Sequence, residues 1–109
     1  MKDWNSKIVS VLANYGVVEI KDQKDLDAFK ELCHKIGLDP FKKDDFDKLV
    51  YYTAKYDAQH RRTYTEPPVY YVEYRNDKGF GFYRDTVTYI TDWFGIAPFS
   101  VEELLEEIK

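Results

Sequence analysis

The sequence predicts an α+β fold, with about five short helices packed on an antiparallel β-hairpin and with Val17 to Lys21 as a candidate third strand. Apolar residues recur at helical spacing in several segments, and two aromatic-rich runs flank a turn signal. Hydrophobic residues make up 44% of the 109 residues and aromatic residues 17%. This apolar content offsets the entropy of ordering one core, so we expect residues 1–109 to form a single domain.

The N-terminal part predicts two helices and a strand. The first helix runs from about Asn5 or Ser6 to Tyr15, and Gly16 is expected to end it in a left-handed conformation. The β-branched run Val17 to Lys21 favours a short strand. From Lys24 to Ile36, apolar residues recur at helical spacing and Gly37 is placed as the C-terminal cap.

A third helix is expected from about Lys43 to Asp57. Aspartates lie near its positive end, and its expected inward residues are Phe46, Leu49, Val50 and Ala54. The stretch Ala58 to Pro68 ends in two consecutive prolines, which block regular structure. We therefore expect a loop there.

The segment Val69 to Arg84 predicts the hairpin. If Asp77-Lys78-Gly79 forms the loop, the pairs are Asn76 with Phe80, Arg75 with Gly81, Tyr74 with Phe82, and Glu73 with Tyr83. One face then carries Tyr70, Val72, Tyr74, Phe80 and Phe82. We expect this face to pack on helices, while Glu73 and Arg75 stay in water because burying unpaired charges is costly.

Two helices are expected to complete the chain. The first runs from about Thr86 to Phe94, with Val87, Ile90 and Phe94 facing inward, and ends at Gly95. The second begins with a capping box, in which Ser100 and Glu103 exchange hydrogen bonds and Phe99 packs on Leu104. Its expected apolar stripe is Val101, Leu104, Leu105 and Ile108.

Composition and charge narrow the function classes. Cys33 is the single cysteine, which fits a reducing compartment and excludes an internal disulfide or a multi-cysteine zinc site. No apolar run reaches the length of a membrane span, so we expect no membrane partner and a cytoplasmic location. The net charge is −4, and residues 92–109 contribute five acidic side chains and one basic side chain. The rest is nearly neutral, which argues against duplex DNA as a partner.

Two features of the sequence are typical of nucleic-acid-binding domains. Three helices followed by a hairpin match the element order of winged-helix DNA-binding domains, but the acidic and basic residues of the third helix cancel. The string Lys78-Gly79-Phe80-Gly81-Phe82 resembles the RNP1 motif of RNA-recognition and cold-shock domains, whose aromatic rings stack on bases. That resemblance implies a single-stranded nucleic-acid binder using Lys78, Phe80, Phe82 and Arg84, with Tyr70 and Tyr74 nearby.

The densest cationic cluster is His60-Arg61-Arg62 with Tyr64, in the expected loop. Such a cluster can clamp a phosphate or an acidic patch of a partner. The alternative, which we favour, is a solvated loop whose arginines pair with the acidic last helix.

No arrangement of residues predicts catalysis. Cys33 and His34 are adjacent on a helix and point about 100° apart, so they cannot form a nucleophile and base pair. The tripeptide Glu19-Ile20-Lys21 resembles half of a restriction-type nuclease core but has no recognisable second acid. A phosphate loop, a metal-ligand spacing and a nucleophile elbow are also missing. We therefore expect a protein that is not an enzyme, with no catalytic residue, no metal and no cofactor.

A protein-binding function remains as the main hypothesis. Ten tyrosines and two tryptophans exceed what this core can hold, and such residues favour protein interfaces. The tyrosines left outward or partly so are Tyr51, Tyr52, Tyr56, Tyr64, Tyr71 and Tyr83. The candidate binding residues are Arg61, Arg62, Tyr64, Tyr71, Arg75 and Tyr83. In size, mild acidity and lack of catalytic motifs the chain resembles phage-encoded and mobile-element inhibitors of host defence, such as anti-CRISPR proteins. The sequence does not predict the oligomeric state.

Overall fold

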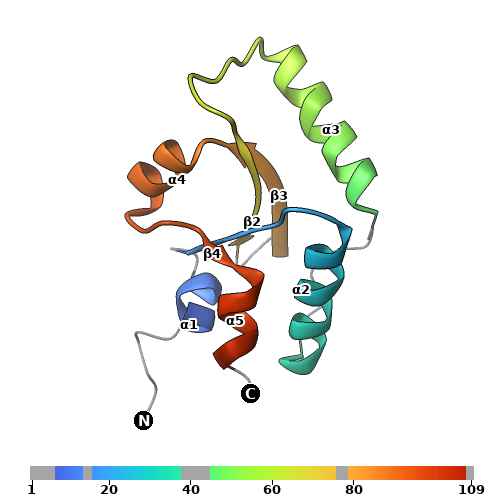
Figure 1. The fold of residues 1–109 in the computed structure, drawn as a ribbon, viewed down its shortest axis with the longest axis vertical. Coiled ribbons are helices and arrows are strands. Elements are labelled where there is room, and N and C mark those ends of the chain that lie inside the picture. Colours follow the sequence, from blue (N-terminus) through green and yellow to red (C-terminus); the bar gives the residue numbers. More distant parts are fainter. Residues whose placement is uncertain (1–6, 14–15, 38–44, 76–78, 108–109) are drawn as a thin grey trace.

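The computed structural model describes residues 7–13, 16–37, 45–75 and 79–107, which contain five helices and four strands (Figure 1). The helices are α1 (Lys7–Leu12), α2 (Gln23–Lys35), α3 (Phe46–Gln59), α4 (Val87–Phe94) and α5 (Val101–Glu107). The strands are β1 (Val17–Glu19), β2 (Val69–Arg75), β3 (Gly79–Asp85) and β4 (Phe99–Ser100). The predicted α+β class and five helices are confirmed.

The strands form one mixed sheet in the order β3-β2-β1-β4. β1 pairs antiparallel with β2, so the candidate third strand is confirmed. β1 also pairs in parallel with β4, in which Val18 lies opposite Phe99. The prediction of a hairpin with at most three strands was therefore wrong, because two residues just before α5 add a fourth strand.

The hairpin has a different register from the predicted one. Arg75 pairs with Gly79 and Tyr74 with Phe80, so residues 76–78 connect the strands and the loop is shifted by one residue. Gly79 has a φ of 75°, the left-handed conformation expected of it. Each β2 residue therefore pairs with a β3 residue two positions earlier than predicted. Because side chains alternate between the two faces with a period of two, every side chain keeps its predicted face.

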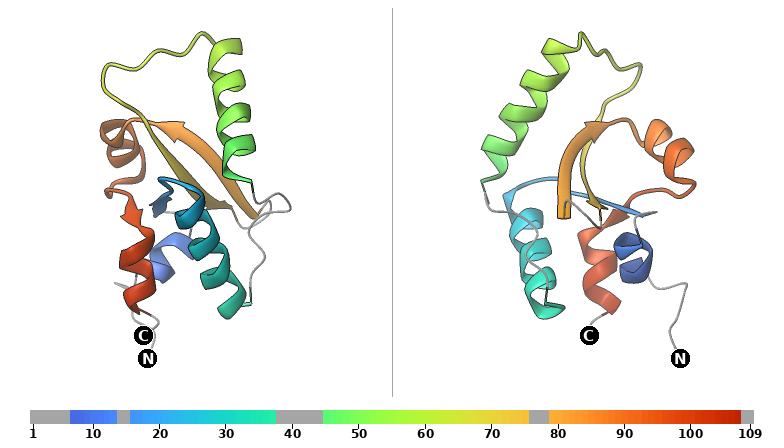
Figure 2. Two further views of the ribbon diagram at one scale, coloured as in Figure 1. Left: turned by 45° about the vertical axis from the view of Figure 1, so that its right-hand side comes forward. Right: turned by 180° about the vertical axis from the view of Figure 1, so that it is seen from behind.

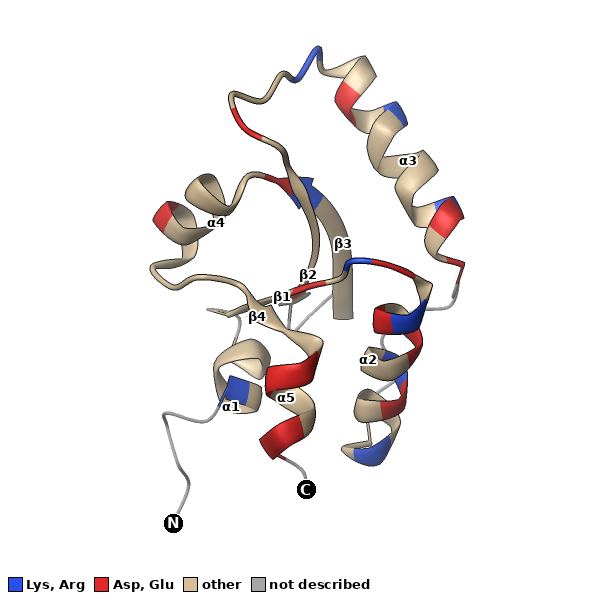
Figure 3. Ribbon diagram, in the orientation of Figure 1, with Lys and Arg blue, Asp and Glu red and all other residues tan. Residues whose placement is uncertain are grey.

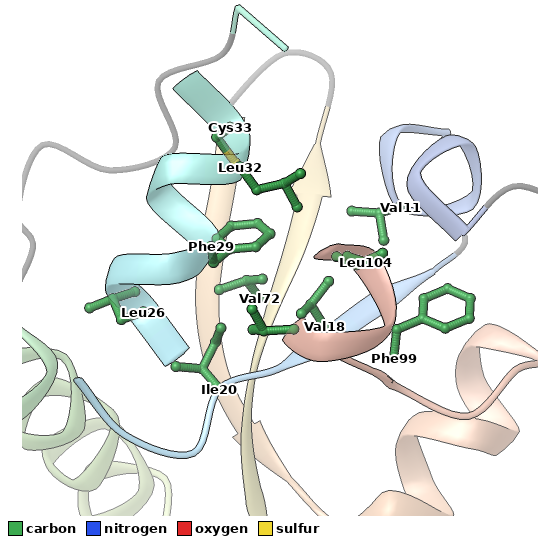
Figure 4. Packing of buried hydrophobic residues seen from close by; sticks show 11 residues of the cluster. Val11, Val18, Ile20, Leu26, Phe29, Leu32, Cys33, Val72, Phe99 and Leu104 are labelled. Atoms are coloured by element: carbon green, nitrogen blue, oxygen red, sulfur yellow. The ribbon is translucent and has the colours of Figure 1, made fainter. Parts of the chain in front are cut away.

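One face of the sheet packs against α1, α2 and α5, which lie together below the strands in Figures 1 and 2. Phe29 of α2 is at the centre of this core and only 1% exposed (Figure 4). Its ring meets that of Phe80 edge to face, with centroids 5.2 Å apart. Val72 lies beneath it, fully buried. Phe80 and Phe82 are half-buried against this core. The prediction that this face packs on helices is confirmed, but of its five predicted residues only Val72 is fully buried.

The other face is covered by α4, on the opposite side of β2 and β3 from α3 (Figure 2). Ile90 packs there with Val17 and Tyr71, all buried. The expectation that this face is wet was wrong, because Tyr71 and Glu73 are both less than one-tenth exposed. Val87, predicted to face inward, is instead exposed.

Helix ends follow local signals. The side chains of Asp22, Asp45 and Thr86 accept backbone N–H hydrogen bonds at the starts of α2, α3 and α4. Ser100 and Glu103 form the predicted capping box, each side chain accepting from the other's backbone N–H at 3.1 Å. Gly37 and Gly95 are left-handed at the ends of α2 and α4.

Gly16 was predicted to be left-handed and is not. Close packing instead explains why glycine occupies this position. A Cβ there would lie 3.1 Å from the carbonyl carbon of Ser10 and 3.2 Å from the Phe99 ring. The predicted last position of the α5 stripe, Ile108, lies outside the described residues, as do both proposed first residues of the N-terminal helix.

In the described part of the chain, no helix has the length and apolar character needed to cross a membrane.

Candidate functional site

A cleft of about 340 Å³ opens between α3 and the edge strand β3. Its walls are mostly apolar and aromatic, with two arginines and one aspartate at one end. The lining residues are Leu49, Tyr52, Thr53, Tyr56, Asp57, Arg62, Tyr71, Phe82, Tyr83 and Arg84. The cleft therefore brings together three of the predicted binding residues, Arg62, Tyr71 and Tyr83.

The cleft exists because α3 lies against the sheet only loosely. Its first turn is anchored by Phe46, whose ring meets Tyr70 at 5.7 Å and Phe82 at 6.1 Å, both edge to face. Further along, Asp57 is the only buried residue of α3, all of which is described. Ala54, predicted to face inward, is exposed. Beyond Leu49, which still packs against the core, the residues of α3 that line the cleft are Tyr52, Thr53, Tyr56 and Asp57, none of them aliphatic.

The far end of α3 is held by a network of charged groups. Oδ2 of Asp57 accepts hydrogen bonds from Nε of Arg84 and from the Tyr64 hydroxyl, both at 2.9 Å. Arg62 donates through Nη2 to Oδ2 of Asp85 at 2.6 Å and lies 3.5 Å from Asp57. The network ties α3, the loop after it and the end of β3 together. It also contradicts the expectation that the loop arginines pair with the last helix, at least for Arg62.

This network is electrically balanced, with two guanidinium groups and two carboxylates. Burial by itself would lower the pKa of Arg62, but the hydrogen bond to Asp85 and the nearby negative charges outweigh it, so the pKa is raised. For Arg84, burial likewise opposes charge, and hydrogen bonds with Tyr70 and Tyr64 raise the pKa. Because each cation has its own anion, this end of the cleft has little excess charge with which to hold a phosphate.

The tyrosines around the network are held in their neutral form. Burial and the hydrogen bond to Asp57 raise the pKa of Tyr64. Burial, followed by the charges of Asp85 and Glu73, raises the pKa of Tyr71. Tyr83 lies across Gly81 on the same face, where a Cβ at Gly81 would overlap the Tyr83 hydroxyl. Tyr71 and Tyr83 line the cleft, and the raised pKa values of Tyr64 and Tyr71 keep these two phenols protonated at neutral pH.

The other three predicted binding residues, Tyr64, Arg61 and Arg75, do not line the cleft. Tyr64 belongs to the network and stacks under both guanidinium groups, 5.3 Å from that of Arg62 and 5.4 Å from that of Arg84. Arg61 is exposed just after α3. Arg75 pairs with Gly79 through its backbone, and its side chain lies outside the described part of the structure.

Arg61 has an unusual backbone conformation, with a φ of 50°. Its N–H bonds to Ala58 O at 3.2 Å and the next N–H to Asp57 O at 2.9 Å, the pattern of a helix end that favours glycine. We expect Arg61→Gly to raise the free energy of unfolding by about 0.5–1 kcal/mol, because a side chain disfavours this conformation. Urea unfolding measures this.

The matched control is Gln59→Gly, one residue inside the same helix end, which should instead lower stability by about 0.5–1 kcal/mol. If Arg61→Gly were neutral or destabilising, the Arg61 side chain would have a stabilising role that its exposure does not suggest.

The aromatic residues of the nucleic-acid hypothesis are half-buried, and two residues of that hypothesis, Phe82 and Arg84, also line the cleft. Phe82 stacks on Tyr70 at 5.7 Å and Phe80 meets Tyr74 at 5.1 Å, in addition to their contacts with helices. Arg84 is bound to Asp57. Lys78 lies outside the described residues. Stacking on bases requires open ring faces, and one face of Phe82 is already covered by Tyr70.

Sequence reasoning missed a second exposed aromatic group, on α4. Trp93 is 72% exposed and Tyr89 is 48% exposed. A signal was present in the sequence, since the two residues are spaced i, i+4 and form an aromatic stripe next to Ile90 on the helix. An eight-residue helix cannot bury both sides against one sheet, so one aromatic pair had to remain outside.

No protein-family model, no curated protein and no solved structure matches this chain.

Proposed function

We propose that this chain is a non-enzymatic protein-binding domain, which acts by occupying a surface of its partner with the exposed side of α3 and the adjacent cleft. The observation that carries the proposal is the row of exposed tyrosines on α3. Tyr51 is 62% exposed, Tyr52 48% and Tyr56 52%. Tyrosine combines a large, rigid contact area with a hydroxyl that can hydrogen-bond, and it is enriched at interface hot spots.

The geometry of these rings supports a contact surface. Tyr52 and Tyr56 are one helical turn apart and both line the cleft. Tyr51 and Tyr52 contact each other with ring centroids 5.6 Å apart, and Tyr56 stacks on His60 at 4.1 Å. Mutual ring contacts restrict side-chain rotation, so less conformational entropy remains to be lost when a partner binds.

The surroundings of the cleft also favour binding over catalysis. Its carboxylate, Asp57, is engaged with two arginines and a tyrosine. His60 lies outside the lining, and its Nδ1–H donates to the carbonyl oxygen of Tyr56 at 2.9 Å. A general base must lie beside its substrate, so His60 is not placed to act on a molecule in the cleft. Cys33 is buried in the core, away from this region.

Within protein binding, we propose an inhibitor or adaptor role of the kind that phages and mobile elements direct against host defence, including anti-CRISPR activity. The support is compositional: a chain of 109 residues, a net charge of −4 and no catalytic motif. A protein that works only by covering a surface needs no more than a stable scaffold and an aromatic patch.

Capture experiments with matched variants test the proposal. Tagged wild-type protein is expressed in the native host, and the captured proteins are compared with those captured by Tyr52→Ser combined with Tyr56→Ser. The wild type should capture one specific protein. The double variant should capture at least tenfold less of it, because the variant removes two central aromatic contacts.

The control is Lys24→Ala combined with Glu31→Ala on α2, which alters a surface away from α3 and should retain the partner. All variants should keep the wild-type melting temperature within a few degrees, since both tyrosines are exposed. Equal capture by the wild type and the tyrosine double variant would refute α3 as the binding surface.

A further inference from the structure

We infer that the outward side of α4 is a second interaction surface, which binds a protein segment carrying arginine or lysine side chains. This inference goes beyond the proposed function, because it concerns a different helix on the other side of β2 and β3 (Figures 1 and 2). It does not depend on the tyrosines of α3.

The surface is built around an aromatic pair. The rings of Tyr89 and Trp93 are nearly parallel, at 8°, with centroids 6.2 Å apart. Both side chains reach solvent, Tyr89 being 48% and Trp93 72% exposed. Ile90, by contrast, is completely buried against the sheet. The inward side of α4 therefore already serves the fold, and the fold gives no role to the aromatic residues on its outward side.

A groove of about 410 Å³, lined by Tyr89 of this pair, lies between α4 and the loop that precedes β2. Its lining contains acidic side chains, hydroxyl groups and Tyr89, but no basic side chain. The lining residues are Thr63, Tyr64, Thr65, Glu66, Asp85, Thr86, Thr88, Tyr89 and Asp92. Figure 3 shows no basic residue on α4, whose one charged residue is Asp92, and the sequence contains neither lysine nor arginine from residue 85 to residue 107.

The acidic groups of the groove are not equivalent. Asp85 is paired with Arg62 at 2.6 Å, so its charge is compensated within the fold. Glu66 is fully exposed, and one of its oxygens accepts from the backbone N–H of Thr88 at 3.3 Å at the start of α4. Hydrogen bonds from Thr88 lower the pKa of Glu66, which keeps it negatively charged. Glu66 and Asp92 thus give the groove its uncompensated negative charge.

Charge and ring geometry together select the chemistry of the partner. A guanidinium or ammonium group can hydrogen-bond to a carboxylate, while the aromatic face beside it attracts the cation. The aliphatic stem of the same side chain can cover the apolar area around Trp93. An acidic or purely apolar segment would leave the carboxylates desolvated without a partner, which is unfavourable.

Titration with a defined probe tests this inference on the whole chain. Acetylated triarginine amide is added to ¹⁵N-labelled protein, and backbone and indole signals are followed. We expect saturable shifts that are confined to α4 and residues 63–66 and that include the Trp93 indole. Asp92→Asn should weaken binding about threefold to tenfold, and Trp93→Ala at least threefold. Triglutamate should cause no shift.

The matched control is Glu106→Gln on α5, which removes one negative charge from an exposed position on another helix and should leave the affinity unchanged. Trp93→Ala keeps all charges and, because this side chain is 72% exposed, should keep the melting temperature. If Asp92→Asn and Glu106→Gln weakened binding equally, or if shifts spread evenly over the acidic helices, the probe would report general electrostatics and the inference would fail.

Two further experiments distinguish the α4 surface from the α3 proposal and from self-association of the chain. Tyr52→Ser combined with Tyr56→Ser should bind triarginine like the wild type, so failure of the α3 proposal would leave the α4 surface intact. Sedimentation velocity should show no self-association that depends on both Asp92 and the exposed Lys55 of α3. Such self-association would make a second copy of this chain the occupant, and a separate basic partner would be refuted.

Discussion

Replacing Phe82 by alanine is expected to lower the free energy of unfolding by about 3 kcal/mol, the lower end of the range for phenylalanine truncation. Phe82 is half-buried, stacks on Tyr70 and contacts Phe46, which anchors the first turn of α3. Its loss removes apolar burial and leaves a cavity where helix and sheet meet. Urea unfolding monitored by far-UV circular dichroism measures the change.

Tyr51→Ala is the matched control, since it truncates an aromatic ring that is 62% exposed and should change stability by less than about 1 kcal/mol. The same pair of variants also tests the RNP1 resemblance. An RNA-binding hairpin would lose affinity for labelled single-stranded RNA with Phe82→Ala while keeping its stability. That result would contradict the assignment of Phe80 and Phe82 to the scaffold.

Replacing Asp57 by alanine is expected to lower the free energy of unfolding by roughly 2–4 kcal/mol. The Asp57 side chain is 7% exposed and is bound by Arg84, Arg62 and Tyr64. Without it, Asp85 remains as the only carboxylate of the network for two partly buried guanidinium groups. The estimate is below that for fully buried pairs, because the side chains of Arg84 and Arg62 are 25% and 33% exposed.

Asp47→Ala provides the comparison on the same helix. Asp47 is exposed in the first turn of α3, and its loss should cost only about 0.3–1 kcal/mol through the helix dipole. If both aspartate variants lost the same small amount of stability, the network would not be what fastens the end of α3, and the cleft would be less firmly defined than its geometry indicates.

The parts of the fold that follow from local chemistry were predictable. The spacing of apolar residues located α2, Gly37 and Gly95 marked helix ends, and the pair Ser100 and Glu103 marked the start of α5. The dry face of the hairpin was also predictable, even though the loop was misplaced. A loop shifted by one residue moves each pairing partner by two positions along the other strand. Since side chains alternate between faces with a period of two, the same side chains stay on the same face.

The remaining features depend on contacts between distant segments. β4 is two residues long and exists only because Phe99 comes to lie beside Val18 of β1. Glu73 was expected in water because nothing in the sequence indicates that α4 folds over that face of the sheet. The bond between Asp57 and Arg84 spans 27 residues without a recognisable motif.

The sequence predicted which residues take part in the candidate site, but it predicted the place and role of only some of them. Tyr51, Tyr52 and Tyr56 were assigned to the surface from helical spacing, and they are exposed. Arg62 and Tyr64 were predicted as binding residues because they form a cationic loop, but the fold uses them to hold α3. A sequence shows which charges exist, whereas their pairing is decided by tertiary structure.

A hydrogen-exchange footprint of the complex with whichever protein the wild-type chain captures would locate the contact surface. We predict slower amide exchange along α3 and residues 60–62 when the partner is bound, with α2 and α5 unchanged. Protection centred on α2 or α5, with α3 exchanging as in the free protein, would contradict the proposal that the exposed tyrosines of α3 form the contact.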